Sequence, residues 1–244
     1  MPQTRKWWPL IKICGIRNQA DAETALRNGA NSIGLLIGLR HKAEDQIDEQ
    51  TGKRIADLVL RKYPQARIVL VTHLLDPVEV KRIAEAVGVT SIQLHDDMRV
   101  EDLRKLRAQM PSIELIKTIH IEGRGQSAAR NAIEKARRYV PYLDAISTDS
   151  KRRDPDGQIR IGGTGRRHSV EAGKRLVRAF PQLPVILAGG LKPSNVESAI
   201  RQIKPAGIDA NSGLETPHGA KDGRKIARFA EAGKKIPPFR FSST

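Results

Sequence analysis

Short apolar runs alternate with helical patterns eight times along this chain of 244 residues. Such runs are typical of parallel strands that helices cover on both faces. Eight strand–helix pairs favour a single closed (β/α)8 TIM barrel of the α/β class, whereas a doubly wound open sheet, the alternative, usually has about five or six strands. The expected strands are Leu10–Cys14, Ser32–Ile37, Ala66–Val71, Ser91–Leu94, Glu114–Ile119, Ala145–Thr148, Val185–Ala188 and Gly207–Ala210, and the expected helices are Gln19–Asn28, Asp48–Tyr63, Pro77–Val87, Arg99–Met110, Ser127–Val140, Ser169–Ala179, Pro193–Ile203 and Lys221–Ala232.

Turn and capping residues support these boundaries. The pair Asn28-Gly29 is typical of a helix C-terminus, and Asp76-Pro77 places a capping carboxylate before a proline in the first helical turn. No Ser/Gly-rich linker and no internal repeat divides the sequence. We therefore expect one domain over residues 1–232, followed by a C-terminal tail over residues 233–244.

The chain is strongly basic, with a formal net charge of +16. Lys and Arg are spread over many expected helices and aromatic residues make up only 4% of the chain, so a solvated basic surface is favoured over a specific nucleic-acid site. One local cluster, made by Lys151–Arg153, Arg160 and Arg166-Arg167, falls within a single expected loop.

Nothing in the sequence indicates export or membrane insertion. There is no run of about 18 apolar residues, and the first eight residues lack the apolar stretch of a secretory signal. The single cysteine allows no internal disulfide. These features predict a cytoplasmic protein without a membrane partner.

A phosphate-binding arrangement is expected near the end of the barrel. The strand in Val185–Leu191 runs into Gly189-Gly190 and then into a helix, so an anion could approach the backbone and the free N–H groups of the helix start. A tight turn would also favour these glycines, which leaves both interpretations open. The next strand also ends in a polar loop, Ser212-Gly213, and two consecutive loops of this kind match the phosphate site of a (β/α)8 barrel.

Two candidate catalytic groups lie at strand ends, where barrel enzymes place their chemistry. Cys14 ends the first expected strand and Asp149 follows the sixth. A lone cysteine is often a buried apolar residue, and an aspartate in this place often caps a loop, so each also has a purely structural interpretation. As a thiolate base and a carboxylic acid on two sides of a bound sugar, they would form an acid–base pair.

Histidines gather at the same end of the expected barrel, which indicates either a metal site or polar contacts to a substrate. Their spacing matches no ligand motif such as His-Glu-x-x-His, so no metal is expected. The histidines at strand ends or in the loops that follow are His41, His73, His95, His120 and His168.

The motifs of the chain, taken together, resemble the phosphoribosylanthranilate isomerase family over about Ile11–Ala232. The resemblance implies a TIM-barrel enzyme of tryptophan biosynthesis, an intramolecular oxidoreductase of the aldose–ketose isomerase type, with no cofactor. The motifs that carry it are Lys12–Ile16, Asp21-Ala22, Gly29-Ala30, Gln93–His95, Gly162–Gly165, Ile186–Leu191, Pro193, Asn195-Val196, Asp209, Ser212–Glu215 and Lys221-Asp222.

The family's reaction is an Amadori rearrangement, and the resemblance assigns roles to matching residues. Asp149 would protonate the furanose ring oxygen, and the Cys14 thiolate would remove the proton at C2′. Asp209 would face the sugar hydroxyls, and Arg40 and His95 would make further substrate contacts. The residues implied for the phosphate are Gly189, Gly190, Ser212 and Gly213.

Three loops depart from the family's pattern at the end that would bind anthranilate. The loop Gly38–Ile47 is about two residues longer, and Asp45 stands where the family has an arginine for the anthranilate carboxylate. Arg40 would substitute for that arginine from a shifted position. Polar or basic residues also replace apolar or aromatic ones in Thr72–Leu74 and in Arg166–Val170.

The sequence therefore leaves more than one function open. The first is the isomerase reaction on a small phosphorylated sugar by a monomer or homodimer. An alternative is a paralogue of this family that acts on a different phosphorylated sugar or anionic ligand. A third is a non-catalytic barrel that binds a phosphorylated ligand or nucleic acid, which the presence of Cys14 and Asp149 disfavours.

Overall fold

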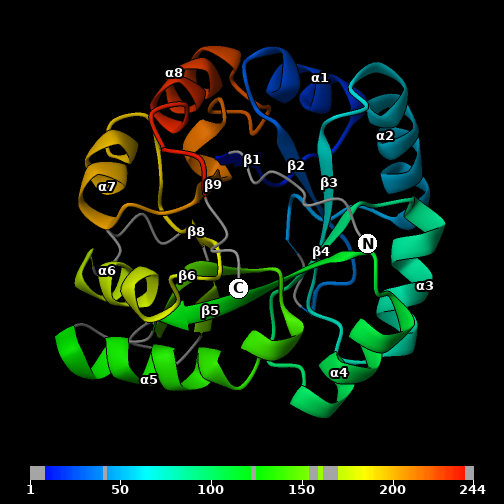
Figure 1. Cartoon of the computed structure of the whole chain (residues 1–244). Helices are drawn as coiled ribbons and strands as arrows, with labels where there is room; N and C mark the ends of the chain where they lie inside the picture. The colour runs from blue at the N-terminus through cyan, green and yellow to red at the C-terminus, as the bar shows by residue number, and fades with distance from the viewer. Residues whose placement is uncertain (1–8, 41–42, 122–124, 154–158, 162–169, 240–244) are drawn as a thin grey trace.

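A ring of parallel strands forms the centre of the molecule (Figure 1). The computed structural model describes residues 9–40, 43–121, 125–153, 159–161 and 170–239. Each strand pairs in parallel with the next, and the ring closes because β1 also pairs with the last strand, β9. The barrel strands are β1 (Leu10–Ile13), β2 (Ser32–Leu36), β3 (Arg67–Thr72), β4 (Ser91–Leu94), β5 (Glu114–Ile121), β6 (Ala145–Arg153), β8 (Val185–Leu187) and β9 (Gly207–Ala210). The predicted single-domain TIM barrel is confirmed.

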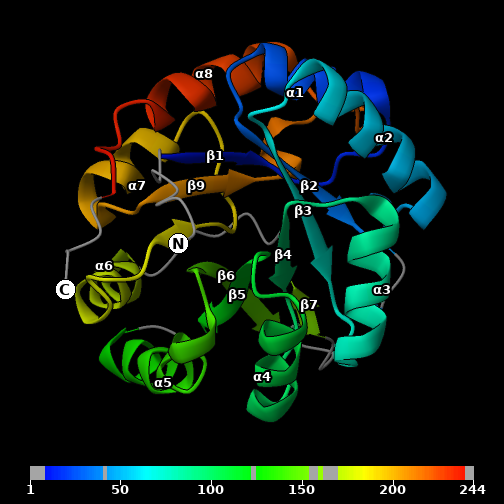
Figure 2. The same cartoon turned by 45° about the vertical axis from the view of Figure 1, so that its right-hand side comes forward.

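Helices cover the outside of this ring, as Figure 2 shows from a second direction. Asn18, Asp48, Asp76 and Asp222 cap four of them through side-chain oxygens that accept backbone N–H groups of the first turn. In the described ranges, no helix is long and apolar enough to cross a membrane. The helices are α1 (Gln19–Arg27), α2 (Glu49–Lys62), α3 (Pro77–Val87), α4 (Val100–Gln109), α5 (Gly125–Arg137), α6 (Val170–Ala179), α7 (Val196–Ile203) and α8 (Gly223–Gly233), with short 3₁₀ turns at η1 (Val140–Tyr142) and η2 (Ser212–Leu214).

The alternation of side chains along the strands divides the apolar core in two, because successive residues point to opposite faces. The larger cluster lies between strands and helices and includes Ile11, Ile13 and Ile55. Each such buried side chain contributes about 1.5–3 kcal/mol through removal of its surface from water. The smaller cluster is formed by Leu10, Val69, Val71, Ile116, Ala145 and Ile186.

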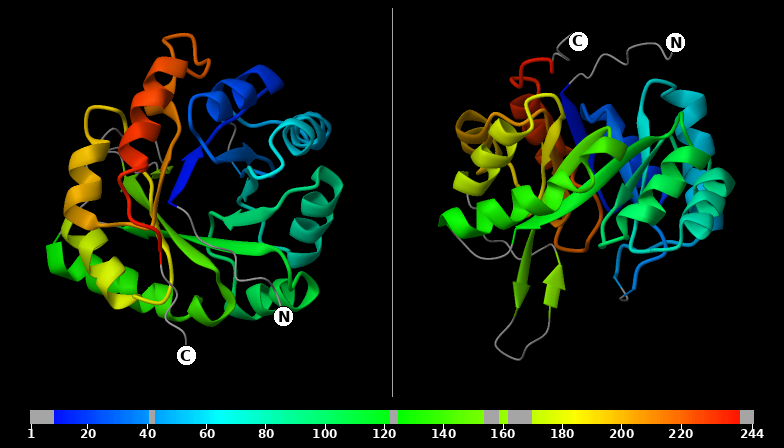
Figure 3. Two further views of the ribbon diagram at one scale, coloured as in Figure 1. Left: turned by 45° about the horizontal axis from the view of Figure 1, so that its top comes forward. Right: turned by 60° about the horizontal axis from the view of Figure 1, so that its bottom comes forward.

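One strand is longer than its sequence indicates. The apolar run ends at Thr148, but β6 continues to Arg153 and pairs antiparallel with β7 (Ile159–Ile161), which the sequence analysis assigned to a loop. Figure 3 shows this hairpin extending beyond the ring of strands. Backbone pairing outside the core needs no apolar side chains, so the hydrophobic pattern could not reveal it. Residues 162–169 lie outside the described residues.

The chain after α8 packs back onto the barrel. Ile236 is only 2% exposed and belongs to the larger core cluster. Phe239 packs against the smaller cluster, which contains Leu10 of β1. The boundary between barrel and tail at residue 233 therefore stays a prediction.

Candidate active site

The two candidate catalytic residues lie at the same end of the barrel, on either side of the predicted phosphate loops. Cys14 directly follows β1, and Asp149 lies in β6 opposite His120 of β5. In the ring, β8 and β9 separate β6 from β1 on one side, whereas β2 to β5 separate them on the other. A ligand whose phosphate binds after β8 and β9 would therefore have Cys14 and Asp149 as its two flanking groups.

A buried lysine connects the end of β1 to β9. Lys12 is 1% exposed, and its Nζ donates a hydrogen bond to Asp209 Oδ2 at 2.7 Å and lies 3.4 Å from Cys14 Sγ. Burial alone would lower the pKa of Lys12, but the charges of Asp209 and Cys14 and the hydrogen bonds to them together outweigh burial, so the net pKa is raised. Lys12 is therefore an ammonium ion. The second oxygen of Asp209, Oδ1, is buried and accepts no hydrogen bond from the described residues.

The environment of Cys14 opposes its ionisation. Removal of solvent from the thiol raises its pKa to about 11, against the lowering effect of the Lys12 charge. The carboxylates of Asp209 and Asp45 raise it further. Cys14 as a whole residue is partly exposed at the barrel mouth. At neutral pH Cys14 is therefore mainly a thiol. Only a nearby cation can favour the thiolate form, which is the form that would act as a base.

Three histidines form a stack beside Asp149. The rings of His73 and His95 stack with centroids 5.0 Å apart, and the rings of His95 and His120 meet edge to face at 4.8 Å. His120 Nε2 donates to the backbone carbonyl of His95 at 2.8 Å, and His95 Nε2 lies 3.3 Å from Asp149 Oδ2. The stack therefore lines the barrel mouth at β3, β4 and β5, away from the phosphate loops.

The stack does not form a metal centre. Among the described residues, no group of three or more His, Cys, Asp or Glu side chains could hold a metal ion. His41 and His168 lie outside the described residues.

The structure places Arg40 and Asp45 apart. The Arg40 side chain is 53% exposed, and its Nε lies 3.4 Å from Asp96 Oδ2 in the loop after β4. Asp45 accepts a hydrogen bond from the side-chain amide of Asn211, which in turn accepts one from Lys221 Nζ at 2.7 Å. Asp45 therefore belongs to a network next to Cys14, and Arg40 lies near the loop that follows His95.

The first predicted phosphate loop follows β8, and the Asn195 side chain makes two hydrogen bonds within its turn. Gly189 and Gly190 have φ angles of 90° and 66°, which favour glycine. The Asn195 side chain accepts from the backbone N–H of Lys192 and donates to the carbonyl of Gly190, both at 2.9 Å. This turn delays the start of α7 to Val196, three residues later than expected from Pro193.

The second predicted phosphate loop, after β9, lies against the first. Ser212 begins the short turn η2, and a Cβ atom at Gly213 would lie 2.2 Å from the carbonyl oxygen of Leu191. Only glycine permits this approach of two backbones. The structure therefore brings together all four residues that the sequence assigned to the phosphate.

Lys12 is the feature of this site that sequence reasoning did not assign. It stood in the motif Lys12–Ile16 without a role, although a lysine inside an apolar strand is unusual. The signal was its spacing, because residues 12 and 14 lie on the same face of a strand.

Comparisons with known proteins agree with this geometry. A family model described as N-(5'-phosphoribosyl)anthranilate (PRA) isomerase matches residues 11–232. N-(5'-phosphoribosyl)anthranilate isomerase 2 of Methanosarcina mazei is 38% identical over 225 residues, which cover 92% of this chain and 93% of that protein.

Two solved structures are similar over almost the whole chain. A phosphoribosyl anthranilate isomerase in complex with reduced 1-(o-carboxyphenylamino)-1-deoxyribulose 5-phosphate is 25% identical with a TM-score of 0.71, covering 93% of this chain and 98% of that chain. Generated monomers of the dimeric Thermotoga maritima enzyme are 26% identical with a TM-score of 0.70 and the same coverage.

Proposed function

We propose that this chain, which belongs to the N-(5'-phosphoribosyl)anthranilate isomerase family, catalyses the Amadori rearrangement of N-(5'-phosphoribosyl)anthranilate to 1-(2-carboxyphenylamino)-1-deoxyribulose 5-phosphate. The family's enzymes are intramolecular oxidoreductases of tryptophan biosynthesis. The observation that supports this reaction most directly is the placement of Cys14 and Asp149 on either side of the loops after β8 and β9.

The proposed reaction needs one acid and one base. Asp149 gives its proton to the furanose ring oxygen, the bond between C1′ and that oxygen breaks, and the anthranilate nitrogen forms an iminium ion with C1′. The Cys14 thiolate then takes the proton from C2′, and the electron pair of that C–H bond neutralises the iminium to give an enolamine. Tautomerisation of the enolamine gives the ketone. Each step moves a proton to or from a positioned side chain.

With the substrate placed between Cys14 and Asp149, Asp209 and the loops after β8 and β9 would contact its sugar and its phosphate. The buried Asp209 Oδ1 without a partner in the described residues is a fitting acceptor for a sugar hydroxyl, because a buried acceptor gains from any donor that reaches it. Gly189, Gly190, Ser212 and Gly213 would offer backbone N–H groups to the phosphate. The phosphorylated product analogue in the related structure is consistent with such a site.

The anthranilate would then lie toward the histidine stack at β3 to β5. His95 would contact it from the end of β4, and Arg40, an exposed side chain in the loop after β2, would reach its carboxylate after leaving Asp96. An arginine and a histidine ring N–H can both donate hydrogen bonds to a carboxylate.

The position of Asp45 favours a second candidate function. A carboxylate where the family has an arginine would repel the anthranilate carboxylate. Another phosphorylated sugar would then suit the barrel mouth, and the chain would be a paralogue within this family. Growth without tryptophan of a strain that lacks the isomerase and carries this gene tests the first function. Failure of growth with folded protein, followed by turnover of another phosphoribosyl amine, would support the second.

The phosphate site gives a prediction of its own. Sulfate or inorganic phosphate is expected to bind between the loops after β8 and β9, because both loops present glycine backbone at the barrel mouth. A crystal structure from sulfate-containing solution would show the ion within hydrogen-bond distance of Gly190 and Gly213. Side chains filling that position would contradict the assignment.

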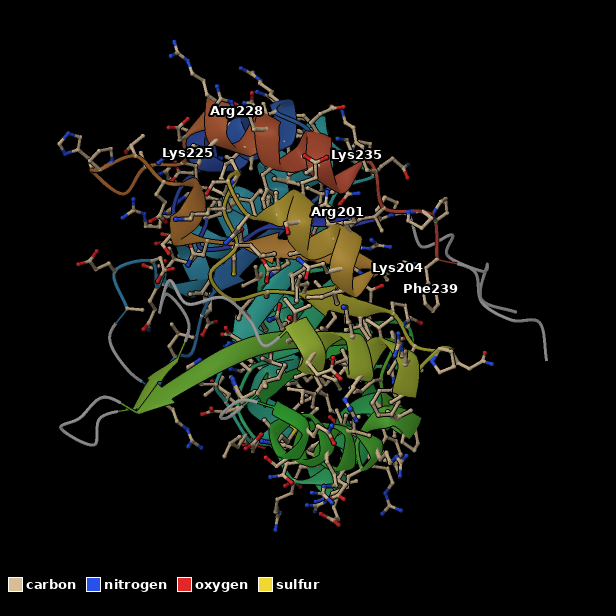
Figure 4. All side chains as sticks on the ribbon, turned by 90° about the vertical axis from the view of Figure 1, so that its left-hand side faces the viewer. Arg201, Lys204, Lys225, Arg228, Lys235 and Phe239 are labelled. Atoms are coloured by element: carbon tan, nitrogen blue, oxygen red, sulfur yellow. The ribbon has the colours of Figure 1, made fainter. Side chains whose placement is uncertain are left out.

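The basic surface is expected not to bind nucleic acid specifically. Figure 4 shows cationic side chains spread along α7 and α8 and just beyond the C-terminal ends of these helices, and one of them, Lys235, pairs with Glu197 at 2.9 Å. Stacking aromatics are few. Binding measured with duplex and single-stranded oligonucleotides should be weak and should fall steeply with salt. A sub-micromolar Kd at physiological salt would refute this prediction. The labelled cations are Arg201, Lys204, Lys225, Arg228 and Lys235.

The remaining expectations concern assembly and location. A related enzyme is dimeric, and we extend the proposal to a monomer or a homodimer that works in the cytoplasm on a small phosphorylated sugar. Sedimentation of the purified protein distinguishes the two assemblies.

A further inference from the structure

A lysine, a thiol and a carboxylate lie in contact inside the barrel mouth. Lys12 Nζ lies between Asp209 Oδ2, at 2.7 Å, and Cys14 Sγ, at 3.4 Å. Lys12 lies in β1 and Asp209 in the adjacent strand β9, whose register pairs the two residues, and Cys14 directly follows β1. The ammonium ion of Lys12 is therefore shared between an oxygen and a sulfur.

A glycine in the neighbouring strand makes room for this arrangement. A Cβ atom at Gly34 of β2 would lie 2.8 Å from Cys14 Sγ and 3.0 Å from Lys12 Cε. Any larger residue at position 34 would displace the Lys12 side chain and the Cys14 sulfur from their present positions. The absence of a side chain at Gly34 therefore leaves the space in which Lys12 lies beside the Cys14 sulfur.

The charges around Cys14 act in opposite directions. Lys12 from β1 is the cation that favours a thiolate, and it does so both by charge and by hydrogen bond. Asp209 from β9 and Asp45 from the loop after β2 favour the neutral thiol. Asp209 has a second effect, because its hydrogen bond draws the Lys12 ammonium toward oxygen.

We propose that Lys12 is the positioning residue that raises the thiolate fraction of the Cys14 base, and that Asp209 limits this effect by drawing the Lys12 ammonium toward its own carboxylate. Ionisation releases the thiol proton to solvent, and the thiolate remains beside the ammonium ion until it accepts the C2′ proton. The role of Cys14 as a base rests on the proposed function, whereas the pairing of Lys12 with Cys14 does not.

The test is alkylation of Cys14, which is the only cysteine of the chain. The rate of reaction with iodoacetamide follows the thiolate fraction, so its pH profile reports the thiol pKa without any substrate. Lys12→Met is expected to slow alkylation at about pH 9 at least tenfold, and Asp209→Asn to accelerate it at least tenfold, since one pKa unit changes the thiolate fraction about tenfold. The control Lys53→Met, at an exposed lysine of α2, should leave the profile unchanged.

A double variant keeps the test available if Lys12→Met does not fold. Lys12→Met leaves the Asp209 carboxylate buried without its cation, whereas Lys12→Met with Asp209→Asn removes both charges. Alkylation of the double variant should be at least tenfold slower than that of Asp209→Asn alone. Equal profiles in that comparison, or a profile of folded Lys12→Met equal to that of the wild type, would overturn the proposal.

The same variants separate this proposal from the proposed function. Shifted alkylation profiles in a protein that does not turn over phosphoribosylanthranilate would support the Lys12–Cys14 pair and reject the reaction. Turnover by the wild type with unshifted alkylation profiles would support the reaction and reject the role of Lys12.

Discussion

Asp149→Asn is expected to lower kcat by about 10²–10⁴, the usual contribution of a positioned general acid. The amide has nearly the shape of the carboxyl group but cannot give a proton to the furanose ring oxygen. Asp149 is 7% exposed and lies 3.3 Å from His95 Nε2, so the substitution keeps a polar group next to the histidine stack. Steady-state kinetics with phosphoribosylanthranilate measures the effect.

The control for this variant is the same substitution at an exposed site. Asp57 of α2 pairs with Lys53 at the surface, and Asp57→Asn should leave kcat and KM unchanged. Binding of inorganic phosphate to Asp149→Asn should also stay near that of the wild type, because the phosphate loops follow β8 and β9. Full activity of a folded Asp149→Asn protein would remove this residue from the mechanism.

The barrel was predictable because its strands are buried on both faces. Strands such as Ser91–Leu94 and Gly207–Ala210 have the predicted bounds, since apolar residues, turn glycines and caps agree there. The positions of Cys14 and the phosphate glycines were predictable for a related reason, whereas Asp149 was expected just after a strand that in fact continues past it to Arg153. In a barrel, the residue at the end of a strand must lie at the mouth, whatever its contacts.

Contacts between distant residues were not predictable from these patterns. Lys12 pairs with Asp209, 197 positions away, and only closure of the barrel between β1 and β9 brings them together. Arg40 has a predicted place in the loop after β2, but its direction depends on Asp96, which no local pattern connects to it. The fold places residues at the mouth, whereas long-range ion pairs decide how they point.

Cys14→Ser is expected to lose at least as much activity as Asp149→Asn, about 10²–10⁴ or more in kcat, because a hydroxyl is a far weaker base than a thiolate. The pH dependence should also change. A thiol whose pKa is raised to about 11 is a thiolate in roughly one molecule in a thousand at pH 8, so kcat/KM of the wild type should rise with pH through the alkaline range. The serine hydroxyl does not ionise there, and the residual activity of the variant should lack this rise.

The stability of the Cys14→Ser variant decides whether Cys14 acts as a base or only contributes to packing. Cys14 is partly exposed at the barrel mouth, so Cys14→Ser should leave thermal unfolding and circular dichroism close to those of the wild type. If the serine variant instead unfolds while its activity per folded molecule stays unchanged, the cysteine contributes packing and not base catalysis. A wild-type rate that stays constant with rising pH would have the same meaning, because a thiol base in this environment must gain activity as it ionises.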